Sequence, residues 1–358
     1  MTRKEWTRMI FMYIISTLLA ICMGCTNSSE TKDDGLRVQN SKYSGYWSGF
    51  WVQSEDEVSS WDNWGDFIGM DAQGDGSVSI DDDLDGFYEN DWFYYTIYED
   101  GTIRGDVFDG IINENEEIIV LIDTDRSDNA LAIQTAIKEA SSMQNSDFFG
   151  AYIVCEFGFD VNTNAHWTSR WVLIANGNGT FDYSILDHSD GSTGSGSMDY
   201  VMSENGRFVV TTNGDKGMLI ADGSCFVLLD DDYSDQTLEF SIGVRKSTGV
   251  TLSSLAGEYI VVRFEGDKEG GVIDFYTSFI ESVVDNAGGA DFEILAASDN
   301  DLISGHYTFT VTDTGEVTIP ETGDQGIASV NNGLLVFVDT DSSNDDDVSL
   351  TIGVKKTR

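Results

Sequence analysis

The sequence predicts an all-β protein built from three tandem domains, each an antiparallel meander of eight strands closed into a barrel or barrel-like sheet. The first observation is a stretch that occurs three times, an apolar run followed by an aspartate-rich loop. Its first aspartates, Asp123, Asp230 and Asp339, lie 107 and 109 residues apart. That period is the size of a domain rather than of a single supersecondary unit. The second observation is a series of short β-branched and aromatic runs broken by Asn-Gly and Asp-Gly pairs, which favour hairpins.

The N-terminus has the features of an export signal. Basic residues precede an apolar run over 9–23, which is too short to span a bilayer, so residues 1–24 are predicted to be a cleaved signal peptide. Gly24-Cys25 resembles the lipobox of bacterial lipoproteins, which implies that Cys25 becomes the lipidated first residue. A plain signal peptide cut nearby is the alternative. Residues 25–42 are polar and are expected to act as a tether.

The three repeats cover 43–141, 148–246 and 255–356, and about 100 residues are enough for a core in each. Each repeat opens with glycine, any residue and an aromatic residue. We align these openings in the frames Gly49-Phe-Trp51, Gly150-Ala-Tyr152 and Gly257-Glu-Tyr259.

Repeat two shows the strand pattern most clearly. Its eight predicted strands are Tyr152–Phe157, Arg170–Ala175, Thr180–Leu186, Met198–Ser203, Arg207–Thr212, Lys216–Ala221, Cys225–Leu229 and Leu238–Val244. The loops between them are too short for a crossover, so the sheet is expected to be an up-and-down antiparallel one. The stretch 129–142 has a helical composition in isolation. Its register against the other repeats nevertheless predicts a strand with Leu131, Ile133, Thr135 and Ile137 on one side.

Eight antiparallel strands must protect their edges, and closure into a barrel removes the edges altogether. The opening Gly-x-Trp or Gly-x-Tyr and a basic residue at the end of the last strand (Lys138, Arg245 and Lys355) resemble lipocalin-like barrels. This resemblance implies a carrier of a small hydrophobic or sugar ligand. The alternative closure is one six-bladed propeller with two blades per repeat, which the unequal halves of each repeat disfavour.

The charge limits the partners. The formal net charge is −44, which argues against nucleic acid and against direct docking on anionic lipid, while 41% apolar residues exclude a disordered acidic chain. Beyond the lipidation site, Cys155 and Cys225 align with aliphatic residues of the other repeats. They are therefore predicted to be small buried hydrophobes, with a disulfide between them as the alternative.

The aspartate loops are the candidate metal sites. Oxygens at i, i+2 and i+5 of a turn can converge on one hard cation, and calcium is the cation expected. The candidate ligands are Asp123, Asp125, Asp128, Asp230, Asp232, Asp235, Asp339 and Asp341. The alternative is that these aspartates cap tight turns by accepting hydrogen bonds from nearby amides.

A second acidic stretch, Asp71 to Asp82, resembles an EF-hand loop in its oxygen spacing. It aligns with connections between strands in the other repeats. A hairpin tip is therefore predicted there.

Aromatic residues are dense in repeat one. Trp51, Trp64 and Trp92 are candidates for the wall of a ligand site, with ordinary core packing as the alternative. The histidines His166, His188 and His306 occupy different repeat positions, and no nucleophile motif is present. No catalytic function is predicted.

Together these features predict a lipoprotein, held at the bacterial outer membrane or cell surface by its lipid anchor. It is expected to bind or display, as an adhesive or structural module that calcium stiffens and that has a protein or glycan partner. The alternative function is the lipocalin-like carrier.

Overall fold

The computed structural model describes residues 37–56, 61–81, 89–105, 107–125, 130–160, 163, 165–230, 237–269, 272–340 and 347–357. The predicted signal peptide, Cys25 and most of the predicted tether lie outside these residues. Within the described part of the chain, no helix has the length and apolarity to cross a membrane.

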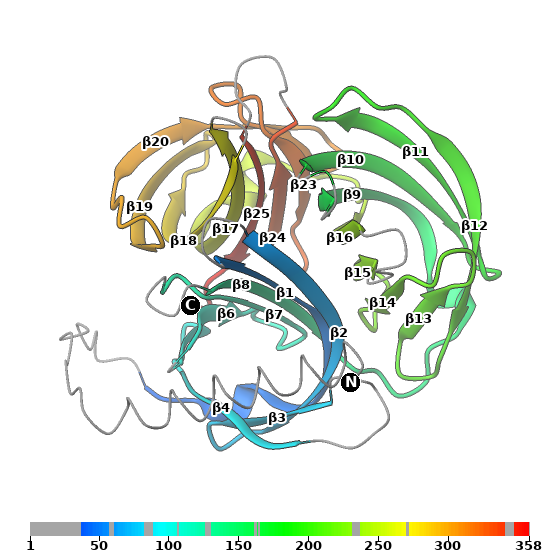
Figure 1. The fold of residues 1–358 in the computed structure, drawn as a ribbon, viewed down its shortest axis with the longest axis horizontal. Coiled ribbons are helices and arrows are strands. Elements are labelled where there is room, and N and C mark those ends of the chain that lie inside the picture. Colours follow the sequence, from blue (N-terminus) through cyan, green and yellow to red (C-terminus); the bar gives the residue numbers. More distant parts are fainter. Residues whose placement is uncertain are drawn as a thin grey trace. The chain divides into compact units, whose positions relative to one another are not determined.

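Repeat one forms a closed antiparallel barrel of eight strands (blue to teal in Figure 1), because its first strand pairs with its last. The strands are β1 (Ser44–Asp56), β2 (Trp61–Gln73), β3 (Ser77–Asp81), β4 (Glu89–Ile97), β5 (Thr102–Gly105), β6 (Asp109–Ile112), β7 (Ile118–Ile122) and β8 (Ala130–Lys138). Strand β8 occupies the stretch of helical composition and confirms the prediction made from the repeat register. The Asp71 region forms the β2–β3 hairpin, so the EF-hand-like spacing belongs to a hairpin tip, as predicted.

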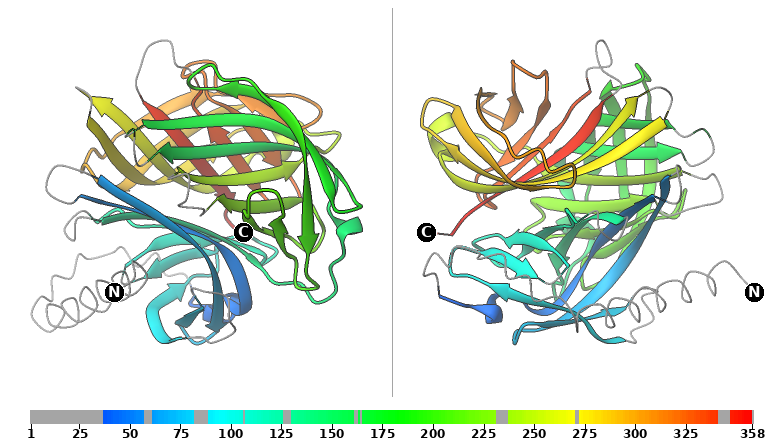
Figure 2. Two further views of the ribbon diagram at one scale, coloured as in Figure 1. Left: turned by 45° about the vertical axis from the view of Figure 1, so that its right-hand side comes forward. Right: turned by 60° about the vertical axis from the view of Figure 1, so that its left-hand side comes forward.

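Repeat two forms a second closed barrel, whose strands run obliquely around its wall (green in Figure 2). They are β9 (Phe149–Asp160), β10 (Ala165–Asn176), β11 (Thr180–His188), β12 (Ser195–Met202), β13 (Arg207–Val210), β14 (Lys216–Leu219), β15 (Cys225–Asp230) and β16 (Thr237–Arg245). Each overlaps one of the eight strands predicted from the sequence.

Repeat three forms a sheet of nine segments whose two edge segments, β20 and β21, are joined through Phe309. The segments are β17 (Gly257–Glu269), β18 (Val272–Val284), β19 (Gly289–Ala297), β20 (Ser304–Thr308), β21 (Thr310–Val311), β22 (Glu316–Thr318), β23 (Gln325–Ser329), β24 (Leu334–Val338) and β25 (Val348–Lys355). As in the two closed barrels, the first strand of this repeat, β17, pairs with the last, β25, and the third sheet is a nearly closed barrel. The tandem-barrel prediction is confirmed, and the six-bladed propeller is wrong.

The opening motif of repeat one lies four residues earlier than the frame we assigned. The basic residue that ends the last strand pairs with Trp47 in repeat one, with Tyr152 in repeat two and with Tyr259 in repeat three. Lys138 Nζ lies 5.5 Å from the Trp47 ring centroid, and Lys355 Nζ lies 5.8 Å from that of Tyr259. The equivalent motif is therefore Gly45-Tyr-Trp47, and the Gly49 frame is wrong.

The strands at the end of each repeat are buried on both faces. In β7, Ile119 and Leu121 point into the first barrel, whereas Ile118, Val120 and Ile122 belong to a second cluster shared with the other two barrels. The same division holds along β15 and β24. This explains why their apolar runs do not alternate with polar residues. Each barrel has an interior core of its own, and one further core joins the outer walls of all three.

Phe240 lies where the three walls meet. Its ring centroid is 5.2 Å from that of Phe50 in the first barrel, 5.4 Å from that of Phe157 in its own barrel and 5.9 Å from that of Phe264 in the third. Aromatic pairs at such distances add to the stabilisation that their burial provides. The shared core is thus continuous across the repeats.

Hydrogen bonds at the aspartate loops also link the barrels. Thr277 Oγ1 in β18 donates to the backbone oxygen of Asp123 at 2.7 Å, and Thr168 in β10 donates to the equivalent oxygen of Asp339. At two of the three contacts between barrels, a threonine hydroxyl of one barrel thus binds the backbone of the first loop aspartate in another.

Cys155 and Cys225 are free and buried in the shared core. This confirms the prediction of small buried hydrophobes and excludes the disulfide. Burial raises the pKa of the Cys155 thiol to about 12 and raises that of Cys225 as well.

Because thiolate is the reactive form, we expect both thiols to react with Ellman's reagent at least a hundredfold more slowly in the native chain than in denaturant. The rate is measured on a chain that begins after Cys25, from the absorbance of the thiolate that the reagent releases. Rapid reaction of either thiol in the folded protein would contradict the shared core.

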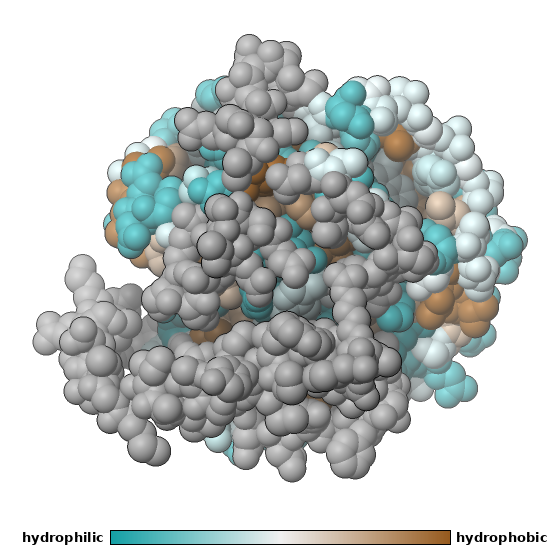
Figure 3. All heavy atoms as spheres, in the orientation of Figure 1, coloured by the Kyte–Doolittle hydropathy of each residue, from teal (hydrophilic) through white to brown (hydrophobic). Residues whose placement is uncertain are grey.

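Apolar side chains on the outer wall of the second barrel are scattered. Ile174, Leu186, Val201 and Val209 are exposed there. In Figure 3, the brown patches over β12 and β13 are separated by pale and teal residues. Singly exposed apolar residues of this kind are ordinary on a protein surface.

Candidate functional site

The two ends of the second barrel differ. At the end where β9 begins, the Phe148 ring packs against four other aromatic rings at centroid distances of 5.2 or 5.3 Å. Those rings belong to Tyr152, Tyr200, Phe208 and Phe226. The Tyr152 hydroxyl also donates a 2.5 Å hydrogen bond to the backbone oxygen of Gly223. This end of the barrel is filled with side chains.

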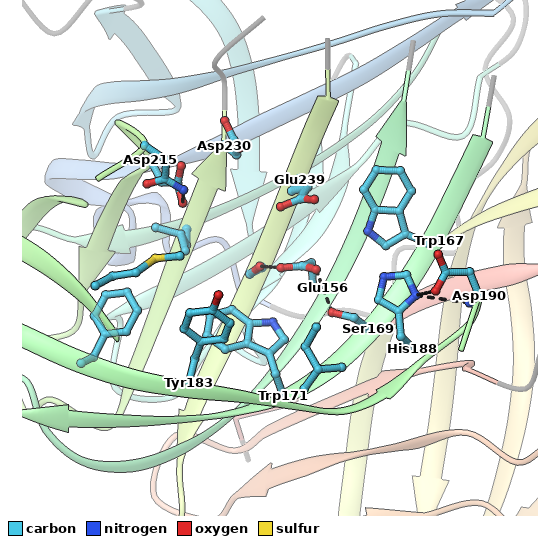
Figure 4. A pocket seen from close by; sticks show the side chains of 16 residues that line it. Glu156, Trp167, Ser169, Trp171, Tyr183, His188, Asp190, Asp215, Asp230 and Glu239 are labelled. Atoms are coloured by element: carbon cyan, nitrogen blue, oxygen red, sulfur yellow. Dashed lines mark hydrogen bonds and ion pairs between the residues drawn. The ribbon is translucent and has the colours of Figure 1, made fainter. Parts of the chain in front are cut away.

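The opposite end holds a cavity of about 390 Å³ (Figure 4). Its lining combines carboxylates with aromatic and aliphatic side chains. The lining residues are Glu156, Trp167, Ser169, Trp171, Phe181, Tyr183, Ile185, His188, Asp190, Met198, Asn213, Asp215, Leu228, Asp230, Glu239 and Ser241. The volume is in the range of small-molecule sites.

Strand alternation places these side chains. On β9, Val154 and Glu156 face the interior, whereas Cys155 and Phe157 face the shared core. Gly158 comes next on the interior face, and a Cβ there would lie 2.2 Å from the Trp167 ring. The glycine thus leaves room for the indole to lie across β9 at the cavity.

Glu156 lies near the middle of the cavity in Figure 4. Ser169 Oγ donates to one of its carboxylate oxygens at 2.7 Å, and Ser241 Oγ donates to the other at 3.1 Å. Burial raises the pKa of this carboxyl, while the two serines and the nearby His188 act in the opposite direction. The hydroxyls hold the carboxylate in place but supply no positive charge.

Asp215 lies to one side of Glu156, close to Asp230 (Figure 4). It is 7% exposed; one of its oxygens accepts a 2.7 Å hydrogen bond from Asn213, and the other, Oδ1, is buried without a hydrogen-bond partner in the described chain. Burial, with the charge of Asp230, raises the Asp215 pKa to about 7. This carboxyl therefore titrates near neutral pH.

The other side of the cavity carries an imidazole. His188 Nδ1 lies 2.6 Å from Asp190 Oδ1, and its ring stacks on Trp167 with centroids 6.3 Å apart. Trp171 lies below Glu156 in Figure 4, next to Tyr183, whose ring centroid is 6.2 Å away. Its Nε1 is buried and forms no hydrogen bond of normal geometry, although it lies toward Glu156.

The lining is acidic. Five of its side chains are carboxylic acids, His188 is its one basic residue, and the described lining includes no lysine or arginine. The adjoining connections, 161–164 and 231–236, also contain neither residue in the sequence. The cavity thus concentrates negative charge between aromatic walls.

The other two barrels fill the same positions differently. The residue four positions after the opening aromatic is Trp51 in the first barrel, Glu156 in the second and Arg263 in the third. The residue directly before β6, β14 and β23 is Phe108, Asp215 and Asp324, respectively. In the first barrel the two positions hold an aromatic pair with ring centroids 5.1 Å apart. In the third, Arg263 lowers the pKa of Asp324 against the larger effect of burial, which raises it.

At these two positions the third barrel thus has opposite charges, and the first has two aromatic rings in contact. In the second barrel both positions are carboxylic acids. Of the three barrels, the second is the one that has two like charges at these two positions.

The predicted calcium ligands are only partly within the described residues. Asp128, Asp232, Asp235 and Asp341 lie outside them. Asp123 accepts a 2.8 Å hydrogen bond from the amide of Asp125, as the turn-capping alternative predicts, and Asp230 lines the cavity. Among the described residues, no three acidic, histidine or cysteine side chains could hold one metal ion. The calcium site stays a prediction.

The predicted tryptophan site is not the cavity described above. Trp51 packs against the core of the first barrel, Trp64 lies partly exposed on β2, and the side chain of Trp92 lies outside the described residues. Sequence reasoning missed Glu156, Asp215, Trp167 and Trp171. The signal that points to them is the acidic pair at positions that are aromatic in repeat one.

No family model matches the sequence, and no curated protein matches it significantly. Among solved structures, transferrin-binding protein B from Haemophilus parasuis is similar at 7% identity, over 90% of this chain and 77% of that one, with a TM-score of 0.28. The protein of the same name from Neisseria meningitidis is similar at 7% identity, over 87% of this chain and 76% of that one, with a TM-score of 0.28.

A protein of unknown function from Nostoc punctiforme is similar at 13% identity, over 61% of this chain and 100% of that one, with a TM-score of 0.19. Scores this low support no conclusion about ligand or partner. The cavity is therefore interpreted from its own residues.

Proposed function

We propose that the protein is a lipid-anchored cell-surface binding protein whose second barrel holds a small ligand. The observation that supports this most directly is the cavity of about 390 Å³ with the buried Asp215 carboxyl in its wall. A buried polar atom without a partner costs free energy unless a ligand or water completes it. The cavity combines such an atom with aromatic walls, which is typical of small-molecule sites.

The proposal differs from the carrier expected from the sequence in its location. The aromatic residues of repeat one favoured the first barrel, but Trp51 is packed against Phe108 there. The second barrel has Glu156 and Asp215 at these positions and keeps an open interior. No reaction is assigned to the cavity.

A cavity-filling variant tests the ligand site. Glu156→Trp with Asp215→Phe transfers the aromatic pair of the first barrel into the second. We expect every small molecule that raises the melting temperature of the unchanged protein to lose at least nine-tenths of its effect in this variant. Glu156→Trp alone serves if the double variant does not fold, as judged by circular dichroism. Ligands that stabilise the filled and unchanged proteins equally would place binding elsewhere and refute the proposal.

The anchor is tested separately in bacterial cells. A palmitate analogue is expected to label the unchanged protein and not Cys25→Ala, and external protease is expected to reach the labelled chain. An unlabelled wild-type chain, released into the medium, would refute the lipid anchor and leave the ligand site unaffected.

A further inference from the structure

We infer that the ligand of the second barrel is an organic cation, a compound with one or more ammonium groups on an apolar or aromatic frame. This inference rests on the proposed function and names the chemical class of its ligand. It is carried by the charge of the cavity, the position of its carboxyls and the nature of its walls.

The charge of the cavity comes first. Glu156 and Asp215 stand where the third barrel has Arg263 and Asp324, so the second barrel lacks the positive partner that its sibling supplies from the chain. The only basic residue of the lining, His188, lies 2.6 Å from Asp190 on the far side of the cavity. A cationic ligand would supply that missing charge, because an ammonium donates hydrogen bonds to carboxylates.

The positions of the carboxyls favour an extended cation over a metal ion. Asp215 and Asp230 lie on one side, Glu156 near the middle and Asp190 on the other side (Figure 4). In the described part of the chain, no three acidic, histidine or cysteine side chains are placed to hold one metal ion. Calcium needs six to eight oxygens at about 2.4 Å, whereas an organic cation can meet separate carboxylates in succession.

The walls supply the rest of the recognition. Trp167 and Trp171 border the acidic groups, and aliphatic side chains, Ile185, Met198 and Leu228, line the remainder. Tryptophan faces attract cations, and aliphatic walls accept the apolar frame of an amine. An anion would meet five acids here, and a neutral sugar would leave Glu156 and Asp215 without an opposite charge.

The buried oxygen of Asp215 identifies where an ammonium binds. Its Oδ1 has no hydrogen-bond partner within the described residues, and the residue is 7% exposed. Asn213 occupies the other oxygen. A donor from the ligand is therefore expected at Oδ1, with Glu156 near enough to influence the same charge.

The test compares matched molecules by isothermal titration calorimetry at pH 8 on the folded chain that begins after Cys25. The cations are 2-phenylethylamine and hexane diamine, and their neutral counterparts are 2-phenylethanol and hexanediol. Each amine is expected to bind at least tenfold more tightly than its alcohol. Calcium chloride serves as the metal probe and is expected not to compete.

Variants locate the amine. Glu156→Gln and Asp215→Asn are each expected to weaken amine binding at least tenfold and to change alcohol binding less than twofold. Asp199→Asn, which removes an exposed charge from β12, is the control and is expected to have no effect. Circular dichroism confirms that each variant is folded.

The outcomes separate this inference from the proposed function. Equal binding of alcohols and amines, or tighter binding of an acid or sugar that the filled cavity abolishes, would overturn the cation class and leave the ligand site standing. Calcium that displaces the amines with micromolar affinity would replace the organic cation by a metal. Failure of every probe to bind the unchanged protein would overturn both.

Discussion

At pH 8, Asp215→Asn is expected to unfold at a higher temperature than the unchanged protein, although it loses amine binding. The Asp215 carboxyl is buried beside Asp230 and Glu156, and its pKa is raised from 3.8 to about 7. Such a group costs free energy when it ionises in the folded state. Asparagine keeps the oxygen that accepts from Asn213 and removes the charge, so the free energy of unfolding is expected to rise by about 2 kcal/mol.

The pH dependence follows from the direction of that shift. Below pH 4 the carboxyl is protonated in both the folded and the unfolded chain, and variant and unchanged protein are expected to be equally stable. Between about pH 4 and 7 the folded protein keeps a proton that the unfolded chain has lost, so its stability falls as the pH rises. The advantage of the variant should therefore grow over this interval and level off above it.

Thermal melts at several pH values measure this difference, with Asp199→Asn as the control for loss of one acid. A variant that is less stable than the unchanged protein at pH 8 would show that Asp215 is a structural group. A variant equally stable at every pH would show that its charge is already compensated.

Phe240→Ala is expected to destabilise the whole described assembly by about 3–5 kcal/mol, because a large buried side chain is lost. Phe240 is 1% exposed and contacts aromatic rings of all three barrels. Its removal leaves a cavity in the shared core that is bordered by all three barrels, so rearrangement within one barrel cannot fill it. Urea unfolding monitored by tryptophan fluorescence is expected to show one transition at a lower midpoint.

Ile174→Ala is the matched control, because Ile174 is an apolar residue of the same barrel that is 47% exposed. Its expected cost is below about 0.5 kcal/mol. A loss below 1 kcal/mol for Phe240→Ala, or a separate early transition of one barrel, would show that the barrels fold independently.

The sequence predicted the architecture well because the information is local and repeated. Strand β8 illustrates this, since a stretch of helical composition was assigned correctly only through its register with the other repeats. The shared core was less visible. Unbroken apolar runs such as 118–122 indicate strands with two buried faces, but the sequence of the run does not show which part of the protein covers the second face.

The frame of the opening motif was ambiguous for a physical reason. Gly45 and Gly49 both precede an aromatic residue by two positions, and only the pairing of Trp47 with Lys138 chooses between them. The cavity was missed because Glu156 and Asp215 line the same space only when the barrel closes. In the chain they are separated by strands that give no sign of their shared interior.

The shared core also constrains how the three repeats can diverge. Their outer walls must remain complementary to one another, while the interiors are enclosed and separate. Trp51, Glu156 and Arg263 show how far the contents of equivalent positions have departed. A repeated domain can thus differ from its copies inside its lumen while the faces that join the copies stay apolar in all three.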